Sequence, residues 1–311
     1  MIILSLLLIT GIAMIYLGAE GLVWGGSQMA IRFRVPPIVI GLSVVAFGTS
    51  LPEFTVSIYS VLSGVQDIAI GNVVGSNIAN VALILATSAV IFPIIANYSV
   101  VRPEILILIA ITIFFMVLSQ DGSLGRVDGA LLLMGIVLYL WRLSRIRALT
   151  PELTPKEKGK HLTIYLASVV GGLIVLALGT HLFINAAVKL ARIIGISELV
   201  IGVTIVAVGT SLPELAASLV AAFRKQSGIV LGNILGSNVF NLMFVLGVIP
   251  IFNPIEVPAQ SRLIQMPIML GITLILLPVL KYQRGIKRWM GIVLLGVYVV
   301  FTVCMYYLDG L

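Results

Sequence analysis

The sequence predicts an all-α membrane protein of ten transmembrane helices, arranged as two inverted five-helix repeats with the N-terminus outside the cell. Two observations support this fold class. The chain has 311 residues, of which 60% are apolar and only 10% charged, whereas a soluble domain is usually about 25% charged. In addition, a long segment of the first half of the chain recurs in the second half.

The recurrence has a constant offset of 161 residues. Gly-Thr-Ser-Leu-Pro-Glu occupies 48–53 and again 209–214, and Gly-Asn-x-x-Gly-Ser-Asn occupies 71–77 and again 232–238. Between Val39 and Leu85, 20 of 47 positions are identical to the residue 161 places later. A repeat of this length indicates an internal duplication of half the chain.

Hydrophobic segments long enough to cross a bilayer, which needs about 20 apolar residues per helix, define the two halves. The first repeat is 1–143, a charged linker covers 144–161, and the second repeat is 162–311. The N-terminal segment lacks a basic region and a cleavage site, and we interpret it as a retained helix rather than a signal peptide. The ten predicted spans are 2–30, 37–62, 68–91, 103–118, 127–143, 162–187, 198–222, 228–251, 264–280 and 289–308.

The basic residues predict the orientation, because cytoplasmic loops are enriched in Lys and Arg. With the N-terminus outside, 15 of the 19 basic residues fall in inner loops and four in outer loops. This distribution explains the net charge of +7 by topology and by contact with the lipid bilayer, and it argues against nucleic acid as a partner. Because each half has five helices, the second half enters the membrane from the opposite side, which is typical of secondary transporters.

Two acidic residues are predicted to lie near the middle of the membrane. Glu53 lies about 16 residues into its helix, and Glu214 is its repeat partner. An intramembrane carboxylate is costly and usually marks an ion or proton path. Two such acids at equivalent positions of an inverted pair should meet between the repeats and form a site with a charge of up to −2.

The residues around these acids offer further oxygen ligands. Pro52 and Pro213 have no N–H, so each deprives the carbonyl four residues earlier of its helical partner. We therefore expect the helix to unwind around Ala46–Glu53 and Ala207–Glu214. The hydroxyls of Thr49, Ser50, Thr210 and Ser211 complete an all-oxygen set, which suits hard cations such as Na⁺ and Ca²⁺. Cys304 lies in an apolar run and is interpreted as a packing residue.

The following helix is predicted to form the facing wall. Asn72, Ser76 and Asn80 are spaced four residues apart and share one helical face, and Asn233, Ser237 and Asn241 repeat the pattern. The asparagines serve either as cation ligands or as interhelical hydrogen-bonding residues. We favour the first role for Asn80 and Asn241 and the second for Asn72 and Asn77.

The paired motifs resemble the alpha repeats of the cation/Ca²⁺ antiporter superfamily, specifically its sodium/calcium exchanger branch, and the resemblance covers the whole chain. It implies a central Ca²⁺ site made by Glu53, Glu214 and the carbonyls of Thr49 and Thr210. The two Na⁺ sites that it implies lie near Ala46, Thr49, Ser50, Glu53 and Ser237, and near Ser76, Ala207, Thr210, Ser211 and Glu214. Asn80 and Asn241 flank a middle position. Many family members carry Asp at one or both of the positions that match these two residues, so K⁺ co-transport and stoichiometry stay open.

We therefore expect an antiporter of the cell membrane that exchanges Na⁺ for Ca²⁺ by alternating access, with no cofactor and no required protein partner. A Ca²⁺/H⁺ or other divalent cation antiporter is the alternative, and a cation channel is a second class. An intramembrane enzyme is disfavoured because Ser50 and Ser211 have no His or Lys base nearby in the sequence. Glu20 and His181, also 161 residues apart, lie on the first helix of each half. They are interpreted as structural residues, or as residues that influence the rate because these two helices slide in the resembling family.

Overall fold

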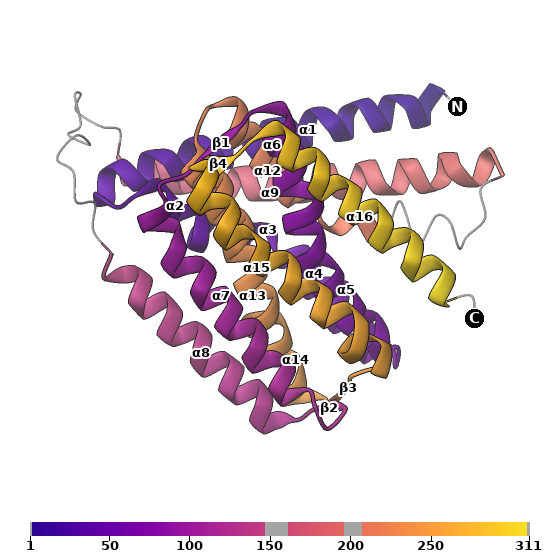
Figure 1. Cartoon of the computed structure of the whole chain (residues 1–311). Coiled ribbons are helices and arrows are strands. Elements are labelled where there is room, and N and C mark those ends of the chain that lie inside the picture. The colour runs from indigo at the N-terminus through magenta and orange to yellow at the C-terminus, as the bar shows by residue number, and fades with distance from the viewer. Residues whose placement is uncertain (1, 147–160, 196–206, 310–311) are drawn as a thin grey trace.

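The computed structural model describes residues 2–146, 161–195 and 207–309. These residues are almost entirely helical, and the helices form one bundle with a continuous apolar core (Figure 1). Eight helices of the described part are long and apolar enough to cross a membrane, and a ninth span results if one bent pair is counted. The predicted span 198–222 is described only from Ala207, and most of the predicted linker 144–161 lies outside the described residues.

The two longest helices, α1 (Ile2–Phe33) and α9 (Leu162–Ile193), pack against each other. They run at a wide angle to most of the other long helices of the bundle (Figure 1). Glycine makes this contact close: a Cβ on Gly18 would lie 2.5 Å from the backbone N of Leu176, and one on Gly172 would lie 2.6 Å from the N of Leu22. Small residues at such crossings let two backbones approach within a membrane.

The predicted span 37–62 is broken into four pieces: α2 (Pro37–Ile40), the π-helical segment η1 (Gly41–Val45), α3 (Ala46–Thr49) and α4 (Leu51–Leu62). The chain bends by 40° between the first three pieces and α4. Only Ser50, with φ −82° and ψ 1°, leaves the helical conformation. The expected unwinding over Ala46–Glu53 is therefore wrong in extent, because the first turn of α4 accommodates Pro52 near its start, where a missing N–H costs no hydrogen bond.

The second repeat has the same break. The short helix α11 (Ala207–Thr210) is followed by Ser211 at φ −89° and ψ 6° and then by α12 (Leu212–Phe223). The expected unwinding over Ala207–Glu214 is again limited to one residue. Since α4 and α12 both have 12 residues and both begin one residue before the motif proline, the repeated sequence produces the same local geometry twice.

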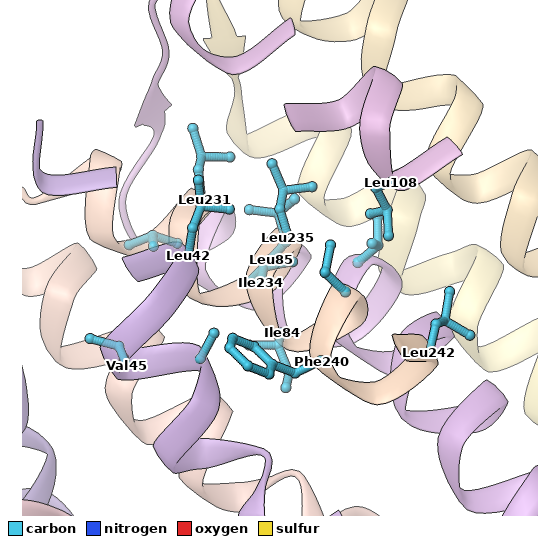
Figure 2. Close-up of a cluster of buried hydrophobic side chains, with 14 of the residues drawn as sticks. Leu42, Val45, Ile84, Leu85, Leu108, Leu231, Ile234, Leu235, Phe240 and Leu242 are labelled. Atoms are coloured by element: carbon cyan, nitrogen blue, oxygen red, sulfur yellow. The ribbon is translucent and has the colours of Figure 1, made fainter. Parts of the chain in front are cut away.

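Two nearly continuous buried helices form the centre of the molecule. One consists of α5 (Gln66–Ala79), the π-helical segment η2 (Asn80–Leu85) and α6 (Ala86–Ile91). The other consists of α13 (Ser227–Phe240), η4 (Asn241–Val245) and α14 (Leu246–Phe252). Figure 2 shows the apolar cluster that packs them against η1 and against α7 (Tyr98–Leu118), with Leu42, Leu85, Leu108 and Leu235 among its members.

The remaining helices lie on the outside of this core. They are α8 (Arg126–Ser144), the π-helical η5 (Ser261–Gln265) leading into α15 (Met266–Gln283), and α16 (Arg288–Asp309). The exposed side chains of α8 and α16 are mostly large apolar residues, including Val127, Leu138, Trp141, Ile292 and Val300. Such faces are suited to contact with lipid acyl chains.

Two short antiparallel strand pairs join loops from the two halves. Strand β1 (Ile94–Ile95) pairs with β4 (Gly285–Ile286), and β2 (Ser123–Leu124) pairs with β3 (Ile255–Glu256). Each pair consists of one strand from the first repeat and one strand from the second. The first pair joins two loops predicted to lie inside, and the second joins two loops predicted to lie outside.

Candidate cation site

The two motif acids lie at equivalent places in the structure. Glu53 is in the first turn of α4 and Glu214 is in the first turn of α12, and their side chains are 1% and 0% exposed. The positive end of a helix dipole favours a carboxylate in the first turn. The broken helices thus carry both acids into the interior.

Serine side chains connect the acids across the repeats. Ser50 Oγ donates to Glu214 Oε1 at 3.4 Å, and Ser211 Oγ donates to Glu53 Oε1 at 3.3 Å. Ser211 Oγ also lies 3.5 Å from Ser76 Oγ. The serine of each break thereby reaches the acid of the other repeat, so the two motifs form one site between the halves.

Among the described residues, one oxygen of each acid has no hydrogen-bond partner. Glu53 Oε2 and Glu214 Oε2 are both buried and unpaired there, as are the amide oxygens of Asn80 and Asn241. Glu104, another buried acid, differs because Arg142 Nη1 donates to its Oε1 at 2.8 Å. An unpaired buried carboxylate is costly, so the two motif acids have the environment expected of groups whose counter-charge is a bound cation.

Asn72 and Asn233 support the helices that carry the acids. The Asn72 amide donates to the Glu53 carbonyl at 3.2 Å and to Ser57 Oγ at 3.0 Å. The Asn233 amide makes the matching contacts with the Glu214 carbonyl at 3.3 Å and Ser218 Oγ at 3.0 Å. Ser57 and Ser218 were not assigned to the site from the sequence. They are identical residues at equivalent positions of the repeat, and this identity was the signal that could have identified them.

The threonine hydroxyl of the first motif reaches the other repeat. Thr49 Oγ1 lies 3.4 Å from Ser237 Oγ and donates to Asn233 Oδ1 at 3.1 Å. The carbonyl of Ala46 accepts from the backbone N of Ser50 at 3.0 Å. Thr210 is buried at the end of α11, and Ala207 begins that helix. The structure therefore brings together Glu53, Glu214, Ser50, Ser211, Ser76, Thr49 and Ser237 through direct contacts.

Asn80 and Asn241 occupy the first positions of the π-helical segments η2 and η4. Single π turns often occur at functional sites, and nothing in the sequence indicated them. Both side chains are at most 1% exposed. Their amide nitrogens bond asparagines of the opposite repeat, which leaves their oxygens as the atoms available to a cation.

The remaining predicted polar residues contact other groups. Glu20 forms an ion pair with Arg224 and accepts from Tyr16 Oη at 3.3 Å. His181 contacts Asn185 one turn along α9. These contacts place Glu20 and His181 at the surface of the α1–α9 pair and not among the oxygens of the site.

The donor set is chemically uniform. Within the described residues, no group of three or more His, Cys, Asp or Glu side chains is placed to hold a metal ion. Two carboxylates, two amide oxygens and several hydroxyls remain, and this all-oxygen combination suits Ca²⁺ and Na⁺ better than a softer metal.

Comparison with known proteins identifies the family. The profile described as sodium/calcium exchanger protein matches residues 3–145 and again residues 164–307. The chain belongs to the sodium/calcium exchanger family. It is thus a multi-pass membrane protein of a family of ion transporters, and the two matches coincide with the two halves of the internal repeat.

Several relatives of this exchanger-family chain are similar over nearly their whole length. Sodium/calcium exchanger MaX1 of Methanosarcina acetivorans is 30% identical, with 97% of this chain and 98% of MaX1 covered. Putative antiporter CaxA of Alkalimonas amylolytica is 35% identical, with 96% and 97% covered. A solved structure of the sodium-calcium exchanger NCX_Mj, soaked with Na⁺ and Sr²⁺, superimposes with a TM-score of 0.86 at 36% identity and covers 97% of this chain and 99% of that one.

Proposed function

We propose that this chain exchanges Na⁺ for Ca²⁺ across the cell membrane by alternating access, and that the ions bind between the two repeats. One observation carries the assignment of the site: two buried carboxylates from equivalent positions each keep an unpaired oxygen. The family, the exchanger MaX1 and the NCX_Mj fold support Na⁺ and Ca²⁺ as the transported ions. Both ions are substrates, and the proposal requires no cofactor.

The proposed ligand set is the one that the family resemblance implies, and the contacts of the serines with the two acids support it. Glu53 and Glu214 supply the charge for Ca²⁺, together with the carbonyls of Thr49 and Thr210. Two Na⁺ positions flank this centre. One uses Ala46, Thr49, Ser50, Glu53 and Ser237, and the other uses Ser76, Ala207, Thr210, Ser211 and Glu214. Asn80 and Asn241 contribute their amide oxygens in the middle of the site.

The coupling of the two ions follows from charge. An empty site leaves two carboxylates unpaired in a low-dielectric interior, which is unfavourable by several kcal/mol per ion. Ca²⁺ neutralises both acids, and Na⁺ ions do so in its place. If only neutralised forms change access, each ion returns only in exchange for the other, and this is antiport.

The proposed topology is ten spans in two inverted repeats, 1–143 and 162–311, joined by a cytoplasmic linker at 144–161, with the N-terminus outside. The equal lengths of α5 and α13 and of α4 and α12 support it. The two strand pairs also support this topology. Each pair joins a loop of one repeat to a loop of the other, and an inverted duplication places equivalent loops on opposite sides of the membrane. The lipid bilayer is the expected environment, and no protein partner is required.

Reconstituted protein tests the function directly. Proteoliposomes loaded with Na⁺ and diluted into Na⁺-free buffer should take up ⁴⁵Ca²⁺, and uptake should collapse when the Na⁺ gradient is dissipated. Glu214→Gln protein, reconstituted at the same density, is the control for leak. Uptake that follows an imposed pH gradient and ignores Na⁺ would replace this proposal with Ca²⁺/H⁺ exchange, and flux that does not saturate and needs no counter-ion would indicate a channel.

A further inference from the structure

Four buried asparagines join the two central helices. Asn77 and Asn80 come from α5 and η2, and Asn238 and Asn241 come from α13 and η4; each is at most 2% exposed. The Asn77 amide donates to the backbone carbonyl of Asn238 at 3.3 Å, and the Asn238 amide donates to the carbonyl of Asn77 at 3.2 Å. The exchange is reciprocal, as the repeat would require.

The same two asparagines hold the other pair. Asn80 Nδ2 donates to Asn238 Oδ1 at 2.9 Å, and Asn241 Nδ2 donates to Asn77 Oδ1 at 3.1 Å. The oxygens of Asn80 and Asn241 have no hydrogen-bond partner in the part of the chain that the structure describes. In each half, one asparagine is hydrogen-bonded through both its amide nitrogen and its amide oxygen, and the other has an oxygen without a partner among the described residues.

These bonds decide which end of an amide faces the site. The oxygen and nitrogen ends of an Asn side chain have nearly the same size, so hydrogen bonds set its orientation. The nitrogen of Asn77 must donate to a carbonyl, so only its oxygen is left to accept from Asn241. That bond in turn fixes the nitrogen of Asn241 away from the site and its oxygen toward it. A rotated amide would present N–H donors to a cation and repel it.

We propose that Asn77 and Asn238 are positioning residues that fix the amide orientation of Asn241 and Asn80, respectively, so that both present oxygen to the transported cation. The inference rests on the proposed function, in which Asn80 and Asn241 belong to the ion site. Among the contacts of the described residues, Asn77 and Asn238 do not touch Glu53 or Glu214, so the proposal gives these two motif residues a role of their own. It also explains why all four buried positions carry Asn and not an apolar residue.

An aspartate at the site distinguishes positioning from general support. A carboxylate presents oxygen in either orientation and needs no partner to orient it. Asn77→Ala should therefore weaken Ca²⁺ binding about tenfold in the otherwise unchanged chain, but less than about twofold in a chain that already carries Asn241→Asp. Asn77→Ala combined with Asn80→Asp is the matched control. This double variant has the same charge, but nothing fixes the amide orientation of Asn241 in it, so the loss of Ca²⁺ affinity caused by Asn77→Ala should persist. Asn238→Ala with Asn80→Asp is the mirror experiment.

The measurement is equilibrium ⁴⁵Ca²⁺ binding to purified protein, with Ca²⁺-dependent thermal stabilisation as a second readout that needs no turnover. Size-exclusion chromatography reports whether each variant is folded. Equal losses from Asn77→Ala in both backgrounds, or no loss at all, would overturn the positioning role, as would an Asn241→Asp protein that binds no Ca²⁺. If Asn241→Leu binds Ca²⁺ normally, the assignment of Asn241 to the site fails instead.

Discussion

At the scale of single residues, the decisive contrast is between acids that the protein neutralises and acids that it leaves unpaired. Glu104 forms an ion pair with Arg142, and Glu20 forms one with Arg224. One oxygen of each motif acid, Glu53 and Glu214, accepts from a serine hydroxyl, and no Lys or Arg pairs with either acid among the ion pairs of the described residues. Removing the charge of either motif acid should therefore have two opposite effects.

Glu53→Gln or Glu214→Gln should abolish Ca²⁺ transport and weaken Ca²⁺ binding about a hundredfold or more, because losing one partner of a buried pair costs about 3–5 kcal/mol. The same change should raise the melting temperature in ion-free buffer, since it removes an uncompensated buried charge. Binding assays and thermal melts measure the two effects. Glu256→Gln, at an exposed position in β3, is the control and should change neither. Near-normal Ca²⁺ flux in either site variant would remove that acid from the ligand set.

Much of the site could be predicted from the sequence because the repeat marks its residues twice. The two glutamates, the serines and Asn80 and Asn241 were all identified by identity at a fixed offset. The hydrogen-bond roles of Asn77 and Asn238 could not be predicted, because they depend on which helix faces which. The π-helical turns at Asn80 and Asn241 carry no propensity signal in these residues, so their local geometry also required the structure.

At the scale of elements, helix packing depends on where glycine occurs. Gly171 and Gly172 are neighbours in α9, yet a Cβ on Gly171 would meet nothing within 4 Å, whereas one on Gly172 would lie 2.6 Å from the backbone of α1. Similarly, a Cβ on Gly232 would lie 2.4 Å from the carbonyl of Ile38. Residues 199–206, which lie 161 positions after residues 38–45, are outside the described residues.

This pair of neighbouring glycines offers a matched test of the α1–α9 contact. Gly172→Ala should destabilise the protein by about 1–3 kcal/mol, because the methyl group has no space between two backbones. Gly171→Ala should be neutral or stabilise by up to about 1 kcal/mol, since alanine is the better helix former. Thermal melts of the detergent-solubilised variants would show the difference. Equal melting temperatures would mean that α1 and α9 are not held at this crossing.

The breaks at Ser50 and Ser211 show how far local sequence rules extend. The prolines at 52 and 213 correctly predicted that each helix is interrupted, because a missing N–H cannot continue the hydrogen-bond ladder. They did not predict the extent of the interruption. A proline tolerated in the first turn of a new helix needs only one non-helical residue before it, and the surrounding packing keeps Ala46–Thr49 and Ala207–Thr210 helical.

At the scale of the whole molecule, the duplication relates the architecture to the proposed mechanism. The equal lengths of α4 and α12 and of α5 and α13, and the paired helix breaks, follow from the repeated sequence. The two strand pairs each join one repeat to the other. The site lies where the two copies meet, so each copy supplies one acid and the serine that bonds the other acid. With the two halves in opposite orientations, as proposed, a site between them can be approached equivalently from both sides of a membrane, as alternating access requires.

The sidedness of this architecture is the last prediction. Ile95 in β1 and Glu256 in β3 are both exposed, and the distribution of basic residues predicts that the first lies inside the cell and the second outside. Cysteines introduced as Ile95→Cys and Glu256→Cys, in a chain whose one native cysteine is replaced by Cys304→Ser, should react differently with a membrane-impermeant maleimide. In intact cells Glu256→Cys should be labelled and Ile95→Cys should not, whereas permeabilised cells should show both. The reverse pattern would place the N-terminus inside, and labelling of both in intact cells would mean that these strand pairs do not lie on opposite sides of the membrane.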